Sequence, residues 1–192
     1  ESFNGSGLGT LWVLATSTTK EIRMLTKTTL TLAACFLSGS LLAQTAPNPM
    51  DVVPEKMPFD LPYGMSIGLT KADAVLDAAV AESGKRHWKL VCAVVDTAGY
   101  LVSFKRMEDA QIGSIDIAMH KARASAKFRR ETKVFESAIQ NNVFIATLDD
   151  VIASRGGIPL MEAGKLVGAI GCSGGTGSQD ELVAKVGAAV LK

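Results

Sequence analysis

The sequence predicts an α+β fold, a single domain in which helices flank an antiparallel β-sheet. Apolar residues recur at helical spacing in several segments, and two hairpin patterns between these segments share the motif AG-x-L-V. The resulting order of helix, hairpin, helices, hairpin and helix is typical of a sheet that carries helices on its faces. The chain has 192 residues, 47% of them hydrophobic, so it can form one real core, which we expect over residues 69–192.

The first half of this domain is predicted to contain a helix and a hairpin. Thr70 suits the N-cap of the helix, and apolar residues follow it at helical spacing: Ala72, Val75, Leu76 and Ala79. Residues 90–95 and 100–105 are typical of two paired strands. We expect Asp96 to cap the turn between them rather than to act as an acid or base.

The middle of the chain is predicted to be helical. Residues 115–127 place apolar side chains on one helix face, and a second helix is expected around residues 134–140. A short apolar run over residues 143–148 leads towards the second hairpin.

The second hairpin and a final helix end the domain. Residues 158–162 and 165–172 are expected to pair, because Ala163 and Gly164 between them can supply a turn with positive φ. The final helix is expected to begin at a capping box formed by Ser178 and Glu181, with an apolar stripe of Leu182, Val183, Val186 and Val190.

A glycine-rich loop at residues 171–177 joins this hairpin to the final helix. Because glycine has no Cβ, backbone N–H groups in such a loop can approach a ligand closely, and the helix N-terminus behind it favours an anion. The loop matches neither a Walker A motif nor a dinucleotide fingerprint. It therefore predicts a cradle for a carboxylate or phosphate group, with a tight turn that binds nothing as the alternative.

The beginning of the chain is typical of an export signal. Residues 24–43 contain a short basic segment, an apolar run and a small residue at the end, which predicts a signal peptide and a periplasmic or secreted protein. Residues 1–23 are interpreted as an upstream extension, and the Pro-rich residues 44–68 as an extended arm. Lipidation of Cys35 is an alternative, whereas a membrane span is disfavoured because the apolar run is shorter than the ~20 residues that a span needs.

Charge and cysteine content restrict the function further. A formal net charge of +1 offers no basic field for nucleic acid. Cys92 and Cys172 could form one disulfide in an oxidising compartment, but nothing in their spacing shows that they meet, and we interpret them as two buried small hydrophobic residues. The sequence contains no cysteine and histidine cluster of the kind that holds zinc.

Three segments together resemble the GlcG/HbpS family of small haem-binding and ligand-binding proteins, which also includes the C-terminal domain of PduO-type proteins. These segments are AVVDTAGYLVSFKRMEDA at residues 93–110, the S-x-x-I-A-x-x-KAR stretch through FRRET at residues 114–132, and GGIPLMEAGKLVGAIGCSGGTGSQDE at residues 156–181. The resemblance implies a profilin-like fold, assembly into a homo-oligomer, and haem or a small anion as the ligand.

The resemblance also suggests site residues. The residues that match the family motifs are Lys121, Arg123, Thr132, Gly157, Pro159, Gly174, Gly175, Gln179 and Asp180. Glu131 departs from the pattern, because many relatives carry proline there.

Haem would need an iron ligand and partners for its propionates. His120 and His87 are the two histidines of the chain, and His120 is the preferred ligand because it lies inside a family motif. Three methionines, Met107, Met119 and Met161, are possible soft ligands but are more simply explained as core residues. Arg130, with Arg129 and Lys121, could pair with propionates, since a guanidinium matches a carboxylate in a bidentate fork.

These observations lead to a non-enzymatic, exported haem-binding protein that serves uptake, storage or sensing. No catalytic residue is assigned, because no nucleophile motif occurs and Asp180 is interpreted as a group that stabilises the helix N-terminus. The alternative is an enzyme or accessory factor of small-carboxylic-acid catabolism of the glycolate type, with Lys121 or Asp180 moving a proton. A purely structural oligomer is the third possibility.

Overall fold

The computed structural model describes residues 52–57 and 59–191. The expected extension, signal peptide and Cys35 therefore lie outside the described residues. Residues 52–55, the described part of the first unit, contain no helix or strand. All the elements below belong to the second unit, which begins at Lys56.

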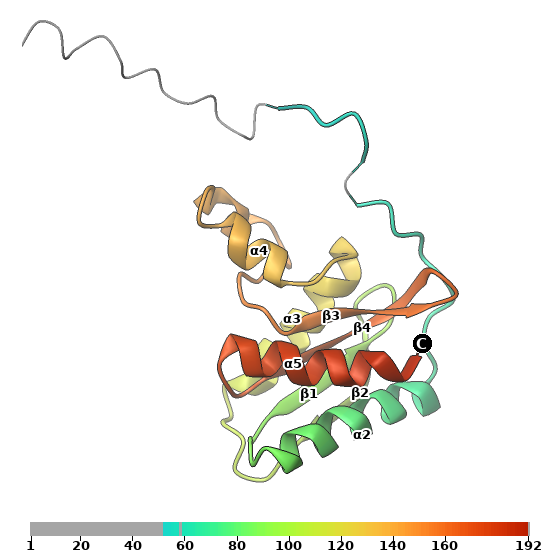
Figure 1. Ribbon diagram of the computed structural model, residues 1–192, viewed down its shortest axis with the longest axis vertical. Coiled ribbons are helices and arrows are strands. Elements are labelled where there is room, and N and C mark those ends of the chain that lie inside the picture. Colours follow the sequence, from blue (N-terminus) through green and yellow to red (C-terminus); the bar gives the residue numbers. More distant parts are fainter. Residues whose placement is uncertain (1–51, 58, 192) are drawn as a thin grey trace, which may run out of the picture. The chain divides into compact units, whose positions relative to one another are not determined.

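The second unit has the expected α+β order (Figure 1). Its elements are α2 (Leu69–Lys85), β1 (Val91–Val95), β2 (Leu101–Arg106), α3 (Ser114–Phe128), α4 (Lys133–Ala138), the 3₁₀ helix η2 (Val143–Thr147), β3 (Gly157–Glu162), β4 (Lys165–Ser173), α5 (Gly177–Ala188) and the 3₁₀ helix η3 (Ala189–Leu191). In the described part of the chain, no helix is long and apolar enough to cross a membrane.

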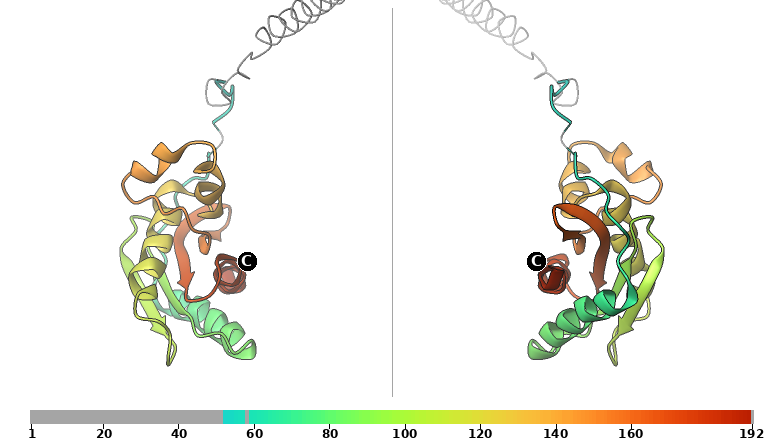
Figure 2. Two further views of the ribbon diagram at one scale, coloured as in Figure 1. Left: turned by 90° about the vertical axis from the view of Figure 1, so that its left-hand side faces the viewer. Right: turned by 90° about the vertical axis from the view of Figure 1, so that its right-hand side faces the viewer.

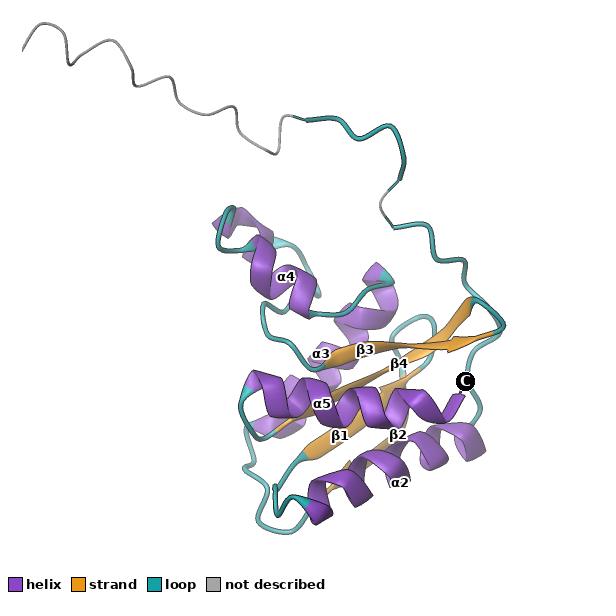
Figure 3. Ribbon diagram, in the orientation of Figure 1, coloured by secondary structure: helices purple, strands orange, loops and turns teal. Residues whose placement is uncertain are grey.

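The four strands form one antiparallel sheet in the order β2-β1-β4-β3 (Figure 3). The two predicted hairpins are confirmed, and the sheet joins them through their inner strands β1 and β4. Ala163 and Gly164 have φ of 48° and 74°, as the predicted turn requires. All five residues of β1 are buried, because this central strand is covered on both faces.

Helices cover the two faces differently (Figure 2). On one face, α2 and α5 pack over a core of branched aliphatic side chains that includes Val75, Leu76, Val94, Leu160, Ile170 and Val183. On the other face, α3 lies over β1 and β4 through small residues, among them Ala122, Ala126 and Ala169. Small side chains let the axis of α3 approach the sheet closely.

Two glycines are required by this close approach. A Cβ on Gly171 would lie 2.2 Å from the Ala118 carbonyl oxygen, and a Cβ on Gly157 would lie 2.3 Å from the Lys121 carbonyl oxygen. Both distances are shorter than any real contact, so α3 can occupy its position only if these two residues have no side chain.

Cys92 and Cys172 form a disulfide. They lie directly opposite each other on β1 and β4, and both are buried. The interpretation of two separate buried thiols was wrong, because strand spacing along the chain does not reveal which strands become neighbours.

Two predicted helix starts also differ from the structure. The first helix begins at Leu69, and its N-cap is Gly68, two residues before the expected cap at Thr70. The capping box of α5 consists of Thr176 and Gln179 rather than Ser178 and Glu181. By contrast, Asp96 caps the first hairpin turn as predicted, since its Oδ1 accepts hydrogen bonds from two backbone N–H groups of that turn.

Candidate ligand-binding site

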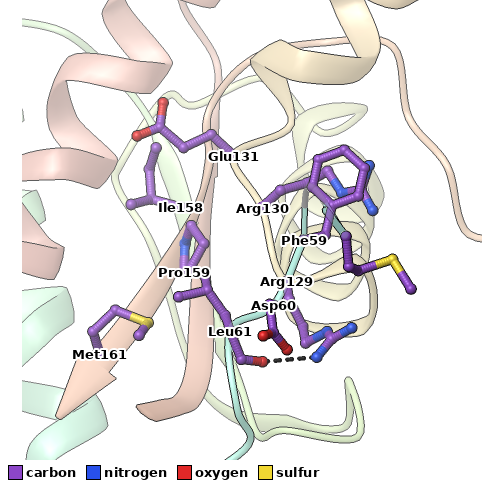
Figure 4. A pocket seen from close by; sticks show the side chains of 10 residues that line it. Phe59, Asp60, Leu61, Arg129, Arg130, Glu131, Ile158, Pro159 and Met161 are labelled. Atoms are coloured by element: carbon purple, nitrogen blue, oxygen red, sulfur yellow. Dashed lines mark hydrogen bonds between the residues drawn. The ribbon is translucent and has the colours of Figure 1, made fainter. Parts of the chain in front are cut away.

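A cavity of about 660 Å³ lies between the last part of the Pro-rich arm, the turn after α3, and β3 (Figure 4). Three segments that are distant in sequence supply its walls. The residues that line it are Met57, Phe59, Asp60, Leu61, Arg129, Arg130, Glu131, Ile158, Pro159 and Met161.

The arm is held at the sheet by backbone pairing. Tyr63 forms an isolated parallel bridge with Leu166 of β4, flanked by hydrogen bonds from Gly64 N to Leu166 O at 2.7 Å and from Leu166 N to Pro62 O at 2.8 Å. The Tyr63 hydroxyl also donates to the carbonyl oxygen of Lys127 at 3.0 Å. These bonds fix residues 59–61 beside the C-terminal end of α3.

The turn after α3 is held by a second set of backbone bonds. Arg129 adopts a left-handed conformation with φ of 54°, which ends the helix and reverses the chain. Thr132 N then donates to Gly157 O at 3.0 Å, and Gly157 N donates to Thr132 Oγ1 at 2.9 Å. The turn is thereby fixed to the first residue of β3.

Both arginines of this turn face the arm. Arg129 donates to the Leu61 carbonyl oxygen at 2.8 Å and lies over the Tyr63 ring at 5.4 Å. Arg130 donates to the Phe128 carbonyl oxygen at 2.9 Å, and its guanidinium carbon lies 3.1 Å from the centre of the Phe59 ring. Each guanidinium is therefore placed by neutral groups.

Within residues 52–57 and 59–191, neither Arg129 nor Arg130 forms an ion pair, although the carboxylates of Asp60 and Glu131 line the same cavity. Many other lysines and arginines of the domain do form ion pairs. Burial lowers the pKa of Arg130 because it removes water from the guanidinium, and the positive charge of Arg129 lowers it further. A negative group bound here would relieve both effects.

The remaining wall is apolar. Pro159 and Met161 of β3 lie across the cavity from Leu61 of the arm (Figure 4), whereas Ile158 lines the cavity but belongs to the core under α2 and α5. A cavity that combines apolar walls with two guanidinium groups that form no ion pair with the described residues, beside the carboxylates of Asp60 and Glu131, suits an amphipathic ligand that directs its anionic substituents to the arginines.

Lys121, Thr132 and Gly157 lie together behind the cavity rather than in it. The Lys121 ammonium is 1% exposed and donates to Asp180 Oδ2 at 2.7 Å and to the Cys172 carbonyl oxygen at 3.2 Å. Thr132 is fully buried, and its hydroxyl oxygen is occupied by the backbone of Gly157. All three residues hold α3, β3 and α5 together.

In the glycine loop, two backbone N–H groups that were expected to bind an anion donate instead to side chains at the start of α5. Gly175 N donates to Asp180 Oδ1 at 3.0 Å, and Thr176 N donates to Gln179 Oε1 at 2.8 Å. Gly174 and Gly175 line a separate cavity of about 390 Å³ together with His87. The structure thus brings His87 near the glycine loop and away from Arg130.

The remaining predicted residues lie on the exposed side of α3. Arg123 donates to the Gly99 carbonyl oxygen at 3.4 Å and lies 4.0 Å from Asp150. His120 is half-buried on the same helix. The pKa of Asp150 is lowered mainly by a hydrogen bond from Lys127, with a weaker electrostatic contribution from His120. Neither Arg123 nor His120 lines the cavity beside β3.

The contribution of the arm to the cavity was not predicted from the sequence. Met57, Phe59 and Leu61 occur among prolines with no regular pattern, so no periodicity marks them as a wall of the cavity. In the sequence, only the neighbouring pair Arg129 and Arg130 at the end of a predicted helix indicated a binding site in this region.

Comparison with known proteins identifies relatives of this chain. Residues 67–189 match the protein family described as "Haem degrading protein HbpS-like". Protein GlcG of Escherichia coli strain K12 is 39% identical over 103 residues, which cover 53% of this chain and 77% of GlcG.

Solved structures show the same fold. A double mutant of Streptomyces reticuli HbpS is 27% identical and superposes with a TM-score of 0.64, covering 73% of this chain and 97% of HbpS. The complex of PduOC with heme is 24% identical with a TM-score of 0.61, covering 67% of this chain and 96% of PduOC. The predicted resemblance is confirmed, and this chain belongs to the HbpS-like family.

Proposed function

We propose that this chain binds haem in the cavity between the arm, the turn after α3, and β3. Membership of the HbpS-like family and the fold shared with PduOC, which has been solved in complex with heme, support this proposal. The observation that carries it is the pair of guanidinium groups, Arg129 and Arg130, at the edge of an apolar cavity.

The residues present fit the chemistry of haem. Haem combines a large apolar macrocycle with two propionates, and the volume of about 660 Å³ lies within the range of small-ligand pockets. Arg129 and Arg130 would hold the propionates, and Pro159 with the arm would cover the macrocycle. When bound, the group would supply an iron centre for redox or ligand chemistry.

A hemin titration followed by the Soret band tests the proposal. We expect saturable binding of hemin to the wild type. The dissociation constant of Arg130→Gln should be at least about tenfold higher, since a hydrogen bond to a charged group contributes about 1.5–3 kcal/mol. Arg106→Gln is the matched control, because Arg106 is exposed at the end of β2 and outside the cavity. Equal affinity of the two variants would contradict the site, and no Soret change with the wild type would contradict the function.

The same titration can separate binding from degradation. The family description names haem degradation, so the Soret band of the saturated complex should be followed over time with a reductant and oxygen present. A band that persists longer than that of free hemin is expected for the non-enzymatic binding protein predicted here.

We also propose export to the periplasm or the cell exterior. The disulfide between Cys92 and Cys172 supports it, because structural disulfides persist in oxidising compartments. Cell fractionation with N-terminal sequencing tests it, and a cytoplasmic chain with free thiols would overturn it. Homo-oligomeric assembly remains a proposal that light scattering of the purified protein would test.

A further inference from the structure

The cavity contains few atoms that can bind iron. In proteins, haem iron is held by imidazole, thiolate, thioether or phenolate side chains. The described residues that line the cavity include no histidine, cysteine or tyrosine, but they include two methionines, Met57 and Met161. His87 lines a different cavity, and His120 lies on α3 outside both.

Met161 lies at the opposite end of the cavity from the arginines. Gly157 at the start of β3 is bonded to Thr132, two residues after Arg130, and Met161 lies four residues further along the strand. At the rise of a strand, this places Met161 on the order of 13 Å from Gly157. Figure 4 agrees, since Pro159 lies between Met161 and Arg130. An iron ligand at one end of the cavity and cationic groups at the other suit haem, whose iron lies at the centre of the macrocycle and whose propionates lie on one edge.

The two methionines differ in how firmly they are held. Met161 is half-buried and belongs to β3, where it pairs with Leu166 of β4. Met57 is 74% exposed and belongs to the arm. A side chain on a paired strand loses less conformational freedom on binding, so Met161 is the better placed of the two.

We propose that the thioether sulfur of Met161 is the iron ligand when haem binds with its propionates towards Arg129 and Arg130. This inference rests on the proposed haem-binding function. A thioether is a soft, neutral ligand, and methionine ligation raises the reduction potential of haem iron. Replacement of Met161 by leucine should therefore lower the potential while leaving the apolar wall intact.

Absorption and magnetic circular dichroism spectra of the ferric complex test the assignment. The wild type and Met57→Leu should show the weak near-infrared charge-transfer band of thioether–iron ligation, and Met161→Leu should lose it while still binding hemin. Met161→His should instead give the ferric spectrum of a haem with one imidazole ligand, which a purely structural role of Met161 would not produce.

The outcomes separate this inference from the function on which it rests. The assignment is overturned if Met161→Leu keeps the band, if Met57→Leu loses it, or if the wild type binds hemin without it, and in each case haem binding stands. If the wild type gives no saturable Soret change, the proposed function fails and the assignment fails with it.

Discussion

Removal of the Lys121 charge should strongly destabilise the domain. Lys121 and Asp180 form an ion pair of 2.7 Å in which both side chains are almost fully buried, at 1% and 3% exposure. In Lys121→Met, the Asp180 carboxylate would keep one described hydrogen bond, from Gly175 N, and would lose its counterion. An uncompensated buried charge costs about 3–5 kcal/mol, which is a large part of the 5–15 kcal/mol by which a domain is typically stable.

A double-mutant cycle shows whether the unpaired charge is the cause. In Lys121→Met with Asp180→Asn, no buried charge remains, and the asparagine oxygen can still accept from Gly175 N. The double variant should therefore be more stable than the sum of the single changes predicts, with a coupling energy of about 2–3 kcal/mol. Lys71→Met is the control, because the pair of Lys71 with Glu162 is exposed and should contribute less than about 1 kcal/mol.

Urea unfolding measured by circular dichroism, with the disulfide intact and at one protein concentration, gives these free energies by linear extrapolation. A cost below about 1 kcal/mol for Lys121→Met would refute the reasoning. Strict additivity of the two changes would refute it as well, because independent side chains have no coupling energy.

Three further predictions concern stability. Replacement of both Cys92 and Cys172 by alanine should lower the free energy of unfolding by about 2–5 kcal/mol, because the bridge joins residues 80 apart in sequence; unchanged denaturant curves would contradict this. A hydrogen bond from the Arg155 side chain lowers the pKa of Glu136. The stability that this carboxylate contributes is therefore fully present above its ordinary pKa of 4.5, and it is lost as the pH falls through the lowered pKa. The urea midpoint of Glu136→Gln should accordingly fall less steeply with acid than that of the wild type, and parallel pH profiles would exclude this role. Gly157→Ala should lower stability by about 1–3 kcal/mol, since its Cβ would lie 2.3 Å from a carbonyl oxygen of α3, whereas Gly84→Ala, in open space on α2, should raise it by up to about 1 kcal/mol; thermal unfolding of the two variants compares them.

Features that depend on neighbouring residues were predictable from the sequence. The turn at Ala163 and Gly164 and the cap at Asp96 use bonds within a few residues, and both occur as expected. The capping box was displaced by two residues, because Ser178 with Glu181 and Thr176 with Gln179 have the same spacing. Only the backbone conformation at Thr176, which is extended, decides between them.

Features that depend on long-range contacts were not predictable. Lys121 and Asp180 are 59 residues apart, and nothing near either residue indicates that α3 and α5 bring them together. The pairing of Cys92 with Cys172 follows from the antiparallel contact of β1 with β4, which joins the two hairpins. The wall formed by Phe59 has the same origin, since it depends on a bridge between the arm and β4.

The arm contributes to the cavity from outside the residues that match the family. Met57, Phe59, Asp60 and Leu61 line the cavity, yet they precede residue 67, where the family match begins. Substitutions or length changes in this segment can reshape the cavity without disturbing the packing of α3 on the sheet. The ligand preference of this cavity can therefore change while the packed domain stays the same.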